Sequence, residues 1–392
     1  MKRVLNVCSM VFLMVFILVA CGGENSKDNA EPNGKGENPT SDSSDITPEA
    51  EGSVSQFKEV ESFKLEGAVT NINFNMNAEG DILYWGENNG GLGDDIRRNV
   101  WVNGEVKELD MDVYPQSSFL TPAGDIISKE VDREAPEGER HTIIEYDPRT
   151  NEEKRIPSGI EDIITLLPSH GTYIQDPNFY IHTETSPNRD DESRTIYWDM
   201  EKNEISNLSF LQDIKDEVGE ITSYVHYFLN SDGSKVYGTA MNAGVFSHDV
   251  ESGETRRLME TDNIMAHGKY TNMLTPDDKY LIYATNDPDA SEIIITYHAL
   301  DVETEETIEL GNGARVFTLA DGNVIIVDGN DVNLYSFEKE ALETIHTIDL
   351  EENQKIDNVT VSMDGSTIAY GYRTKNDGDE GTTFEMSIWS NK

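Results

Sequence analysis

Short apolar segments alternate with small polar turns along the chain from residue 57 onward. Six turns carry Gly or Asp, and a seventh, at residues 169–172, is degenerate. The turn positions are Gly80, Gly124, Gly171, Gly233, Asp278, Gly322 and Gly365, spaced 44, 47, 62, 45, 44 and 43 residues apart. Because Gly and Asp accept a positive φ, turns of this composition between apolar segments predict β-hairpins.

The residues flanking the turns support this interpretation. The third residue after each turn position is branched and apolar in all seven repeats: Leu83, Ile127, Ile174, Val236, Leu281, Ile325 and Ile368. The fourth residue before it is apolar in six of seven, the exception being Thr318. These positions predict inward-facing strand residues, and a period near 45 residues is typical of one propeller blade. The sequence therefore predicts an all-β fold, a seven-bladed β-propeller over residues 57–392.

The longest spacing, 62 residues, exceeds a typical blade by about 17. Within it, residues 209–219 carry Phe210, Leu211, Ile214 and Val218 at helical spacing and end at a Gly. We expect a short helical insert between the third and fourth blades. Its apolar side is expected to cover the barrel, and recruitment of a partner is the alternative.

The two ends of this region are expected to meet. The last repeat has room for strands at residues 367–372 and 383–390 and is then one strand short of a blade. Residues 57–65 form a spare strand before the first turn. Since an unpaired sheet edge is a liability, we expect this N-terminal strand to close the last blade.

A second turn recurs further along the repeats. Three segments share the form Asp-x-x-Ser/Thr-x-Glu, beginning at Asp147, Asp249 and Asp301, and Trp198-Asp199 stands at the same place in its repeat. The Asp side chain can close an Asx turn onto the backbone. In these features the sequence resembles the WD-repeat and TolB-like propeller families, in which an aromatic-Asp pair ends the third strand and an Asp-Gly turn joins the first two.

The resemblance covers about 330 residues. It departs from the true WD repeat in lacking the Gly-His dipeptide and in having Trp-Asp only once. It implies a propeller fold and leaves the function open, since propellers serve many functions.

The N-terminus has the features of an export signal. Lys2 and Arg3 precede an apolar run over residues 4–20, which ends in Leu-Val-Ala before Cys21. This ending closely resembles the bacterial lipobox, whose Cys receives a diacylglyceryl group. We therefore expect residues 1–20 to be a lipoprotein signal peptide and Cys21 to be the lipid attachment site, on the extracytoplasmic face of the cell membrane. An ordinary signal peptide with a chance cysteine is the alternative.

Residues 21–56 are expected to be the lipidated Cys and a disordered acidic tether. Over residues 22–53 the apolar side chains are only Ala30, Ile46 and Ala50, among Gly, Asn, Ser, Pro, Asp and Glu. Such a segment buries too little surface to offset its ordering entropy.

The overall composition excludes several classes. With 75 acidic and 30 basic side chains the formal charge is −45, which excludes a nucleic-acid binder. The 36% apolar content excludes a wholly disordered chain. Both cysteines, Cys8 and Cys21, precede the tether, so no disulfide or cysteine zinc site is available to the propeller.

Catalytic motifs are not evident. The sequence has no His-Glu-x-x-His, Gly-x-Ser-x-Gly or glycine-rich phosphate loop, so we assign no catalytic residue and expect no cofactor. His226, His248 and His298 lie in or beside predicted strands and are interpreted as packing residues.

The connections between second and third strands are the strongest candidate ligand face. If both kinds of turn share one face, these connections lie on the other, and five of them (87–97, 130–140, 184–194, 286–292 and 373–381) carry 18 acidic and 7 basic residues. The candidate residues are Asp94, Asp95, Asp190, Asp191, Asp287, Asp289, Asp377 and Asp379. The last four are spaced as Asp-x-Asp pairs that can offer oxygen ligands to Ca²⁺, without the remaining ligands of a known calcium loop. A solvated acidic surface is the alternative.

Two function classes follow. The first is a non-enzymatic binding or scaffolding module, a monomer held on the membrane by its lipid, for an extracytoplasmic protein, peptide or glycan. The second is a lactonase- or glycosidase-like hydrolase or lyase that uses carboxylates and a divalent metal. We favour binding, because no catalytic constellation stands out in the sequence.

Overall fold

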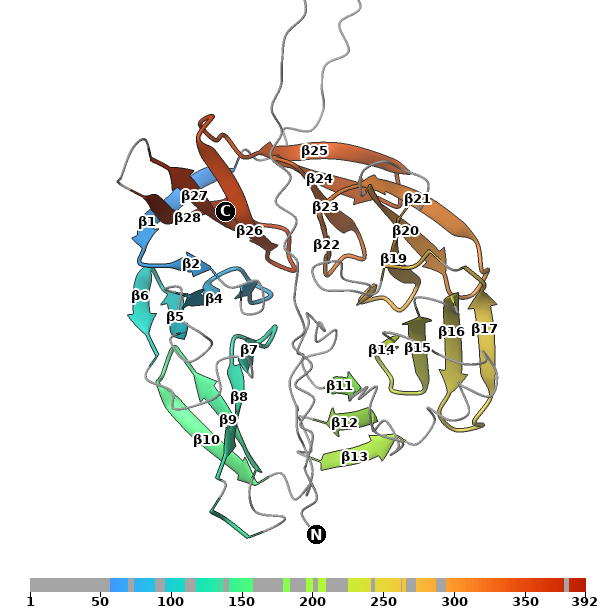
Figure 1. Cartoon of the computed structure of the whole chain (residues 1–392). Helices are drawn as coiled ribbons and strands as arrows, with labels where there is room; N and C mark the ends of the chain where they lie inside the picture. Colours follow the sequence, from blue (N-terminus) through green and yellow to red (C-terminus); the bar gives the residue numbers. More distant parts are fainter. Residues whose placement is uncertain are drawn as a thin grey trace, which may run out of the picture. The chain divides into compact units, whose positions relative to one another are not determined.

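The computed structural model describes residues 57–69, 74–88, 96–109, 118–132, 134–136, 141–157, 179–183, 195–199, 204–208, 225–240, 244–261, 263–265, 273–286, 294–376 and 381–392 (Figure 1). All described residues belong to one compact unit. The predicted signal peptide, Cys21, the tether and the helical insert at 209–219 lie outside the described residues. No helix in the described ranges is long and apolar enough to cross a membrane.

The described residues form seven antiparallel sheets, which we label A to G, and contain no helix. Sheet B contains β2 (Ala68–Val69), β3 (Asn75–Met76), β4 (Ile82–Asn88), β5 (Ile96–Val102) and β6 (Glu105–Glu108). Sheet C contains β7 (Ser118–Leu120), β8 (Ile126–Val131), β9 (His141–Asp147) and β10 (Glu152–Pro157). Sheet D contains β11 (Phe179–Thr183), β12 (Thr195–Asp199) and β13 (Glu204–Leu208).

The second half of the chain continues this pattern. Sheet E contains β14 (Val225–Leu229), β15 (Lys235–Ala240), β16 (Gly244–Asp249) and β17 (Thr255–Met259). Sheet F contains β18 (Met273–Leu274), β19 (Tyr280–Asn286), β20 (Ile295–Asp301) and β21 (Thr307–Asn312). Sheet G contains β22 (Arg315–Thr318), β23 (Val324–Asp328), β24 (Asp331–Ser336) and β25 (Ala341–Thr347). Sheet A combines β26 (Gln354–Val361), β27 (Thr367–Lys375) and β28 (Thr382–Ser390) with the first strand, β1 (Lys58–Leu65).

The hairpin turns have the predicted backbone conformation. In the six described turns φ lies between 59° and 101°, at Gly80, Gly124, Gly233, Asp278, Gly322 and Gly365. The third residue after each of them is fully buried: Leu83, Ile127, Val236, Leu281, Ile325 and Ile368 are all 0% exposed. The prediction is thus confirmed for six repeats, and the seventh, with Gly171 and Ile174, lies outside the described residues.

The position four residues before each turn is not equivalent in every sheet. In sheets A, B, E and F it pairs with the buried residue three after the turn, as in Leu274↔Leu281. In sheets C and G the turn is one residue shorter, so the partners of Ile127 and Ile325 are Phe119 and Phe317. The expectation of one shared position was therefore wrong in these two sheets, and the shift explains the exception at Thr318.

The Asp-x-x-Ser/Thr-x-Glu turns also form as predicted. β9, β16 and β20 end at Asp147, Asp249 and Asp301, and each carboxylate accepts hydrogen bonds from the turn that follows. The bond from Ser252 N to Asp249 Oδ1 is 2.8 Å, and the bond from Thr304 N to Asp301 Oδ1 is 2.9 Å.

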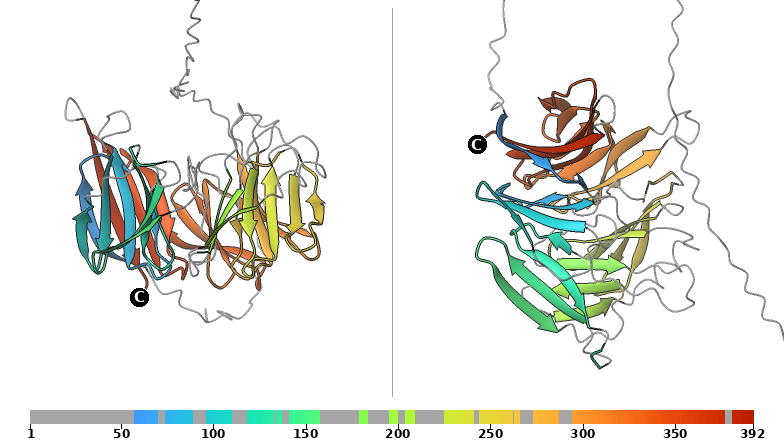
Figure 2. Two further views of the ribbon diagram at one scale, coloured as in Figure 1. Left: turned by 90° about the horizontal axis from the view of Figure 1, so that it is seen from below. Right: turned by 60° about the vertical axis from the view of Figure 1, so that its left-hand side comes forward.

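Both kinds of turn lie at the same end of a sheet. Val302 N, after the third strand of sheet F, donates to Lys279 O in the first turn of that sheet at 3.0 Å. We call this end the turn face and the opposite end, with the connections between second and third strands, the loop face. The C-terminus lies at the turn face, where Asn391 N donates to Ser366 O (Figure 2).

Neighbouring sheets are joined at the turn face. Asp364 N donates to Ala78 O, and Ala78 N donates to Pro122 O, so that the first turns of sheets A, B and C are linked. Ala320 N donates to Met363 O between sheets G and A. Apolar clusters fill the spaces behind these turns between sheets B and C, A and B, and G and A. The first strand contributes to this packing, because β1 pairs with β28 from Lys58↔Ser390 to Leu65↔Phe384.

Candidate functional site

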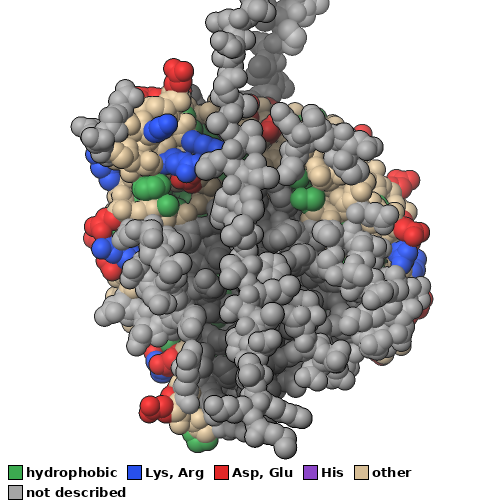
Figure 3. All heavy atoms as spheres, in the orientation of Figure 1, with side chains coloured by type: hydrophobic (Ala, Val, Ile, Leu, Met, Phe, Trp, Pro, Cys, Tyr) green, Lys and Arg blue, Asp and Glu red, His purple; other side chains and the backbone are tan. Residues whose placement is uncertain are grey.

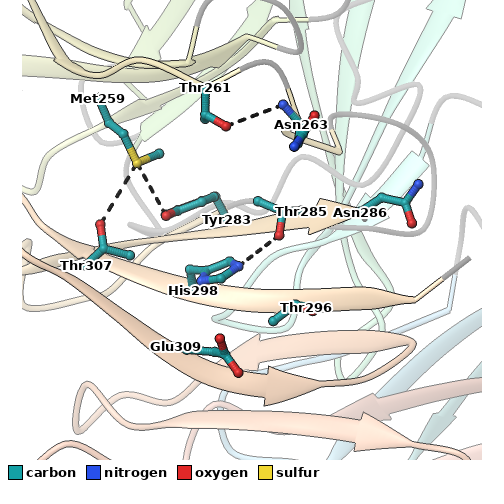
Figure 4. Close-up of a pocket in the computed structure, with 10 residues that line it drawn as sticks. All are labelled: Met259, Thr261, Asn263, Tyr283, Thr285, Asn286, Thr296, His298, Thr307 and Glu309. Atoms are coloured by element: carbon teal, nitrogen blue, oxygen red, sulfur yellow. Dashed lines mark hydrogen bonds between the residues drawn. The ribbon is translucent and has the colours of Figure 1, made fainter. Parts of the chain in front are cut away.

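A polar groove lies between sheets E and F and has a volume of about 440 Å³ (Figure 4). Sheet E contributes Met259 at the end of β17, and the segment after it contributes Thr261 and Asn263. Sheet F contributes the remaining lining residues, which are Tyr283, Thr285, Asn286, Thr296, His298, Thr307 and Glu309. Glu309 is the one acidic side chain of the ten, in a chain with many carboxylates.

Strand alternation explains why this side of sheet F is polar. Tyr283 pairs with His298, and Thr285 pairs with Thr296, so these four side chains share one side of β19 and β20. The alternating residues on the other side are apolar and buried: Ile282, Ala284, Tyr297 and Ala299. Sheet F therefore keeps one side wholly in the core and presents the other side to the groove only beyond the buried Leu281.

His298 is held in place by two neighbours. Its Nε2 lies 2.8 Å from Thr285 Oγ1, and its ring stacks on Tyr283 with the centroids 5.1 Å apart and the planes 18° apart. Burial lowers the pKa of His298 below its usual 6.5, and the negative charge of Glu309 partly opposes this. The imidazole is thus neutral at neutral pH and offers one donor and one acceptor nitrogen.

Two hydroxyl groups of the groove have a weak hydrogen-bond acceptor. Tyr283 Oη donates to Met259 Sδ at 3.4 Å, and Thr307 Oγ1 donates to the same sulfur at 3.9 Å (Figure 4). A thioether is a poor acceptor compared with a carbonyl or carboxylate oxygen. Burial raises the pKa of Tyr283, so its hydroxyl stays protonated and remains a donor.

The segment after β17 forms the rim of the groove. Ile264 makes an isolated bridge with Thr285, and Asn286 N donates to Asn263 O at 3.2 Å. The side-chain oxygen of Asn286 is buried and has no hydrogen-bond partner among the described residues. The groove is therefore fixed by main-chain bonds on the side of sheet E as well as by strands of sheet F.

The site residues predicted from the sequence lie outside the described residues. This holds for Asp94, Asp95, Asp190, Asp191, Asp287, Asp289, Asp377 and Asp379, and for Cys21. The structure accordingly neither brings these carboxylates together nor separates them. Among the described residues, no group of three His, Cys, Asp or Glu side chains is arranged to hold a metal ion.

The loop face is basic at its described part in sheet A. Lys355 and Arg373 are register partners, and Lys375 lies two residues further along β27. All three are exposed, and Arg373 Nε lies 3.3 Å from Asp357 Oδ1. Figure 3 shows Lys and Arg side chains gathered on this part of the face. The described strand ends next to residues 377–380 therefore add positive charge to a face that the sequence predicts to be acidic.

Sequence reasoning missed the groove and interpreted His298 as a packing residue. A signal was present, because Thr285, Thr296 and His298 place polar residues on the strand side that also carries the apolar Leu281. Alternation alone does not show which neighbouring element lies opposite, so it cannot distinguish a groove from a solvent-exposed strand.

Comparison with known proteins gives a likeness of fold only. No family model matches the chain, and no curated protein matches it. Among solved structures, a chain of the mitotic checkpoint complex has a TM-score of 0.50 at 14% identity, covering 88% of this chain and 96% of that one. An oligogalacturonate lyase from Vibrio parahaemolyticus has a TM-score of 0.47 at 10% identity, covering 85% and 97%. The chain of the checkpoint complex is propeller-like, which agrees with the all-β sheets described above.

Proposed function

We propose that residues 57–392 form a seven-bladed propeller that is closed by its N-terminal strand. Three observations support this architecture. Seven sheets follow one another along the chain. The first strand, β1, pairs with the last strand, β28. Main-chain hydrogen bonds join the turns of sheets G, A, B and C. Closure by a strand from the other end of the chain removes the exposed edge of the last sheet.

The propeller is held on the extracytoplasmic face of the cell membrane by a lipid on Cys21. This part of the proposal rests on the sequence Leu18-Val19-Ala20-Cys21 after a basic head and an apolar run. Replacing Cys21 with Ser is expected to release the protein from membranes or to leave an unprocessed precursor. Normal processing with detergent-resistant membrane attachment would overturn it.

The function that the geometry supports best is non-enzymatic binding. The observation that carries it is the groove between sheets E and F, where Tyr283 and Thr307 direct hydroxyl donors at a thioether and His298 is neutral. Groups of this kind gain from a ligand that offers stronger acceptors, because the ligand replaces a weak bond with a strong one. The acidic connections of the loop face provide a second contact for a macromolecular partner.

The test uses the intact lipidated protein in detergent, mixed with solubilised envelopes and then recovered. One variant carries Asn at positions Asp94, Asp95, Asp190 and Asp191, and a second carries His298→Ala with Thr307→Ala. Loss of the same partner in either variant, with unchanged melting temperature, supports binding. Recovery of no partner, together with hydrolysis of lactones or glycosides by the wild type, would replace it with the enzymatic function.

A hydrolase or lyase is the second candidate, and one contact favours it. Thr285 Oγ1 lies 2.8 Å from His298 Nε2, the separation of a hydroxyl nucleophile and its base. Glu309 pairs in register with His298 on the next strand. Loss of turnover in both Thr285→Ala and His298→Gln, with partner binding retained, would establish this function.

A further inference from the structure

Sheets B and F carry different side chains at equivalent positions, and the difference indicates what the groove binds. Leu83 and Leu281 each follow a turn of the same length by three residues. Two residues further on stand Trp85 and Tyr283, and four further on stand Glu87 and Thr285. The cross-strand partners also correspond: Trp85 pairs with Asn99 as Tyr283 pairs with His298, and Glu87 pairs with Val69 as Thr285 pairs with Ile264.

In sheet B this place is occupied by a carboxylate. Glu87 is 5% exposed, and its two oxygens accept four hydrogen bonds. Oε1 accepts from Trp85 Nε1 at 2.9 Å and from Asn99 Nδ2 at 2.8 Å. Oε2 accepts from the main-chain nitrogens of Glu66 and Gly67, at 2.9 and 3.3 Å. No ion pair to Glu87 occurs among the described residues, so neutral donors hold this buried negative charge.

In sheet F, side chains that can donate stand at the positions of Trp85 and Asn99, and the carboxylate is missing. Tyr283 Oη takes the place of Trp85 Nε1, and the ring of His298 takes the place of the Asn99 amide. Thr285, where sheet B has Glu87, is too short to reach across and bonds to His298 instead. The space that the Glu87 carboxylate fills in sheet B therefore corresponds to the groove in sheet F (Figure 4).

We propose that the groove between sheets E and F binds the carboxylate group of a small organic acid, which takes the place that Glu87 fills in sheet B. This inference rests on the proposed binding function and names its ligand class. The carboxylate accepts hydrogen bonds from Tyr283 Oη, Thr307 Oγ1 and the ring N–H of His298. The bonds from Tyr283 and Thr307 are stronger than their present bonds to the sulfur of Met259, because the acceptor is charged. The volume of about 440 Å³ is that of a small-molecule site.

Among the described residues that line the groove, one carboxylate is present, that of Glu309. Glu309 is exposed, so water weakens the effect of its charge, which still acts on the adjacent His298. The buried Glu87 is held by hydrogen bonds from neutral donors, and Arg97, its register partner, forms an ion pair with Glu66. A carboxylate with three or more donors needs no cation beside it.

The first test builds the missing carboxylate into the chain. Thr285→Glu restores at sheet F the residue of sheet B, and Thr285→Gln is the control of equal size without charge. Both are made in the full chain with Glu309→Gln, which removes the one carboxylate among the described lining residues. Thr285→Glu is expected to melt at or above the temperature of Thr285→Gln. If Thr285→Glu melts well below Thr285→Gln, the proposal is overturned, because the groove then does not stabilise a carboxylate.

The second test adds the ligand to the full-length protein in detergent and measures binding by calorimetry. The probes are matched pairs, N-acetylglycine with N-acetylglycinamide and glucuronate with glucose, and the pairs distinguish a peptide terminus from an acidic sugar. At least one acid is expected to bind ten times more tightly than its neutral partner, and Tyr283→Phe and Thr285→Glu are expected to weaken it tenfold or more. Equal affinities within both pairs, or no binding of either acid at millimolar concentration, would overturn the proposal. The envelope experiment tests the binding function separately from the ligand class. If a partner is lost only in the variant with the loop-face Asp residues replaced, the binding function stands even when no acid binds in the groove.

Discussion

The boundary between sheets A and B is sealed, whereas the boundary between sheets E and F is open at the same positions. At the sealed boundary Phe63 of β1 packs on Trp85, with ring centroids 5.5 Å apart, and Glu87 ties the segment after β1 to sheet B. At the open boundary Met259 of β17 takes the place of Phe63, and Thr285 the place of Glu87. Two sheets with the same hairpin turn thus differ in the residues that lie towards the loop face.

A third boundary shows that sealing can be achieved in another way. Between sheets G and A, His346 packs against both Phe57 and Trp389, with centroid distances of 5.4 and 5.0 Å. Trp389 Nε1 donates to Ser387 Oγ at 2.7 Å, whereas His346 Nε2 is buried and has no hydrogen-bond partner among the described residues. The buried residue three positions after each turn is common to the sheets. The residues further along the same strand differ, and they either fill the space between two sheets or line a groove there.

Deleting residues 57–65 is the most severe way to break the sealed boundary. The deletion removes β1, the buried Phe57 and the Phe63 contact with Trp85, and it exposes the edge of β28. Burial of two or three large apolar side chains is worth about 4 kcal/mol or more, so we expect cooperative unfolding to be lost or the midpoint to fall strongly. Deleting residues 22–53 is the control and should leave the melting temperature unchanged. Equal melting temperatures for the two deletions would refute closure by the N-terminal strand.

Replacing Glu87 with Ala is the next largest perturbation. It leaves four donors, among them Trp85 Nε1 and Asn99 Nδ2, without their acceptor. A buried donor without a partner costs about 1–3 kcal/mol, so we expect a loss of roughly 3 kcal/mol or more in urea unfolding. Thr285→Ala, at the equivalent position of the open boundary, should cost less than about 1 kcal/mol. Similar losses for the two variants would show that the boundaries do not differ in this way.

Substitutions at two glycines of sheet B distinguish the cost of a steric clash from the cost of backbone strain. Gly80 has a φ of 74°, and a Cβ there would lie 2.5 Å from Thr367 Oγ1 of sheet A. Gly104 has a φ of 79° and would meet nothing within 4 Å. We expect Gly104→Ala to cost about 1 kcal/mol from the left-handed conformation alone, and Gly80→Ala to cost roughly 1–2 kcal/mol more. If the two variants unfold at the same urea concentration, the turns of sheets A and B are not packed as described.

The sequence was sufficient to predict the hairpins because their determinants are local. A positive φ at Gly80 or Asp278 and a buried Leu83 or Leu281 depend on residues within one turn. The register in sheets C and G was missed for a related reason, since Gly124 and Gly322 also have a positive φ but in a turn that is one residue shorter. Counting from the glycine therefore assigned Thr318 to a position that Phe317 fills.

The groove was not predictable because it depends on what faces sheet F. Thr285 and His298 have the alternation of a half-buried strand, and the sequence alone gives no sign that Met259 lies opposite Tyr283. The equivalence of Glu87 and Thr285 likewise requires the register of both sheets, since each residue lies 4 positions from its inward-facing leucine in an otherwise unremarkable strand. Contacts between sheets, not within them, determine the site.

The smallest effect we predict concerns two histidines, His298 at the boundary between sheets E and F and His346 at the boundary between sheets G and A. Burial lowers the pKa of both His298 and His346, and Glu309 opposes the shift only at His298. Because the pKa of each histidine is lower in the folded protein, the unfolded chain binds more protons between the folded pKa and 6.5. The contribution to the free energy of unfolding is therefore fully present above pH 6.5 and is lost as the pH drops through this window. Glu309→Gln removes the group that raises the pKa of His298 and should extend the loss to lower pH, by less than about 1 kcal/mol. The measurement is the free energy of unfolding from mildly alkaline to mildly acidic pH, with the double variant Glu309→Gln and His298→Gln as the control that should lose the added dependence. If stability depends less on pH in Glu309→Gln than in the wild type, Glu309 is not the neighbour that raises the pKa of His298. The pH dependence that His346 causes is the same in all the variants.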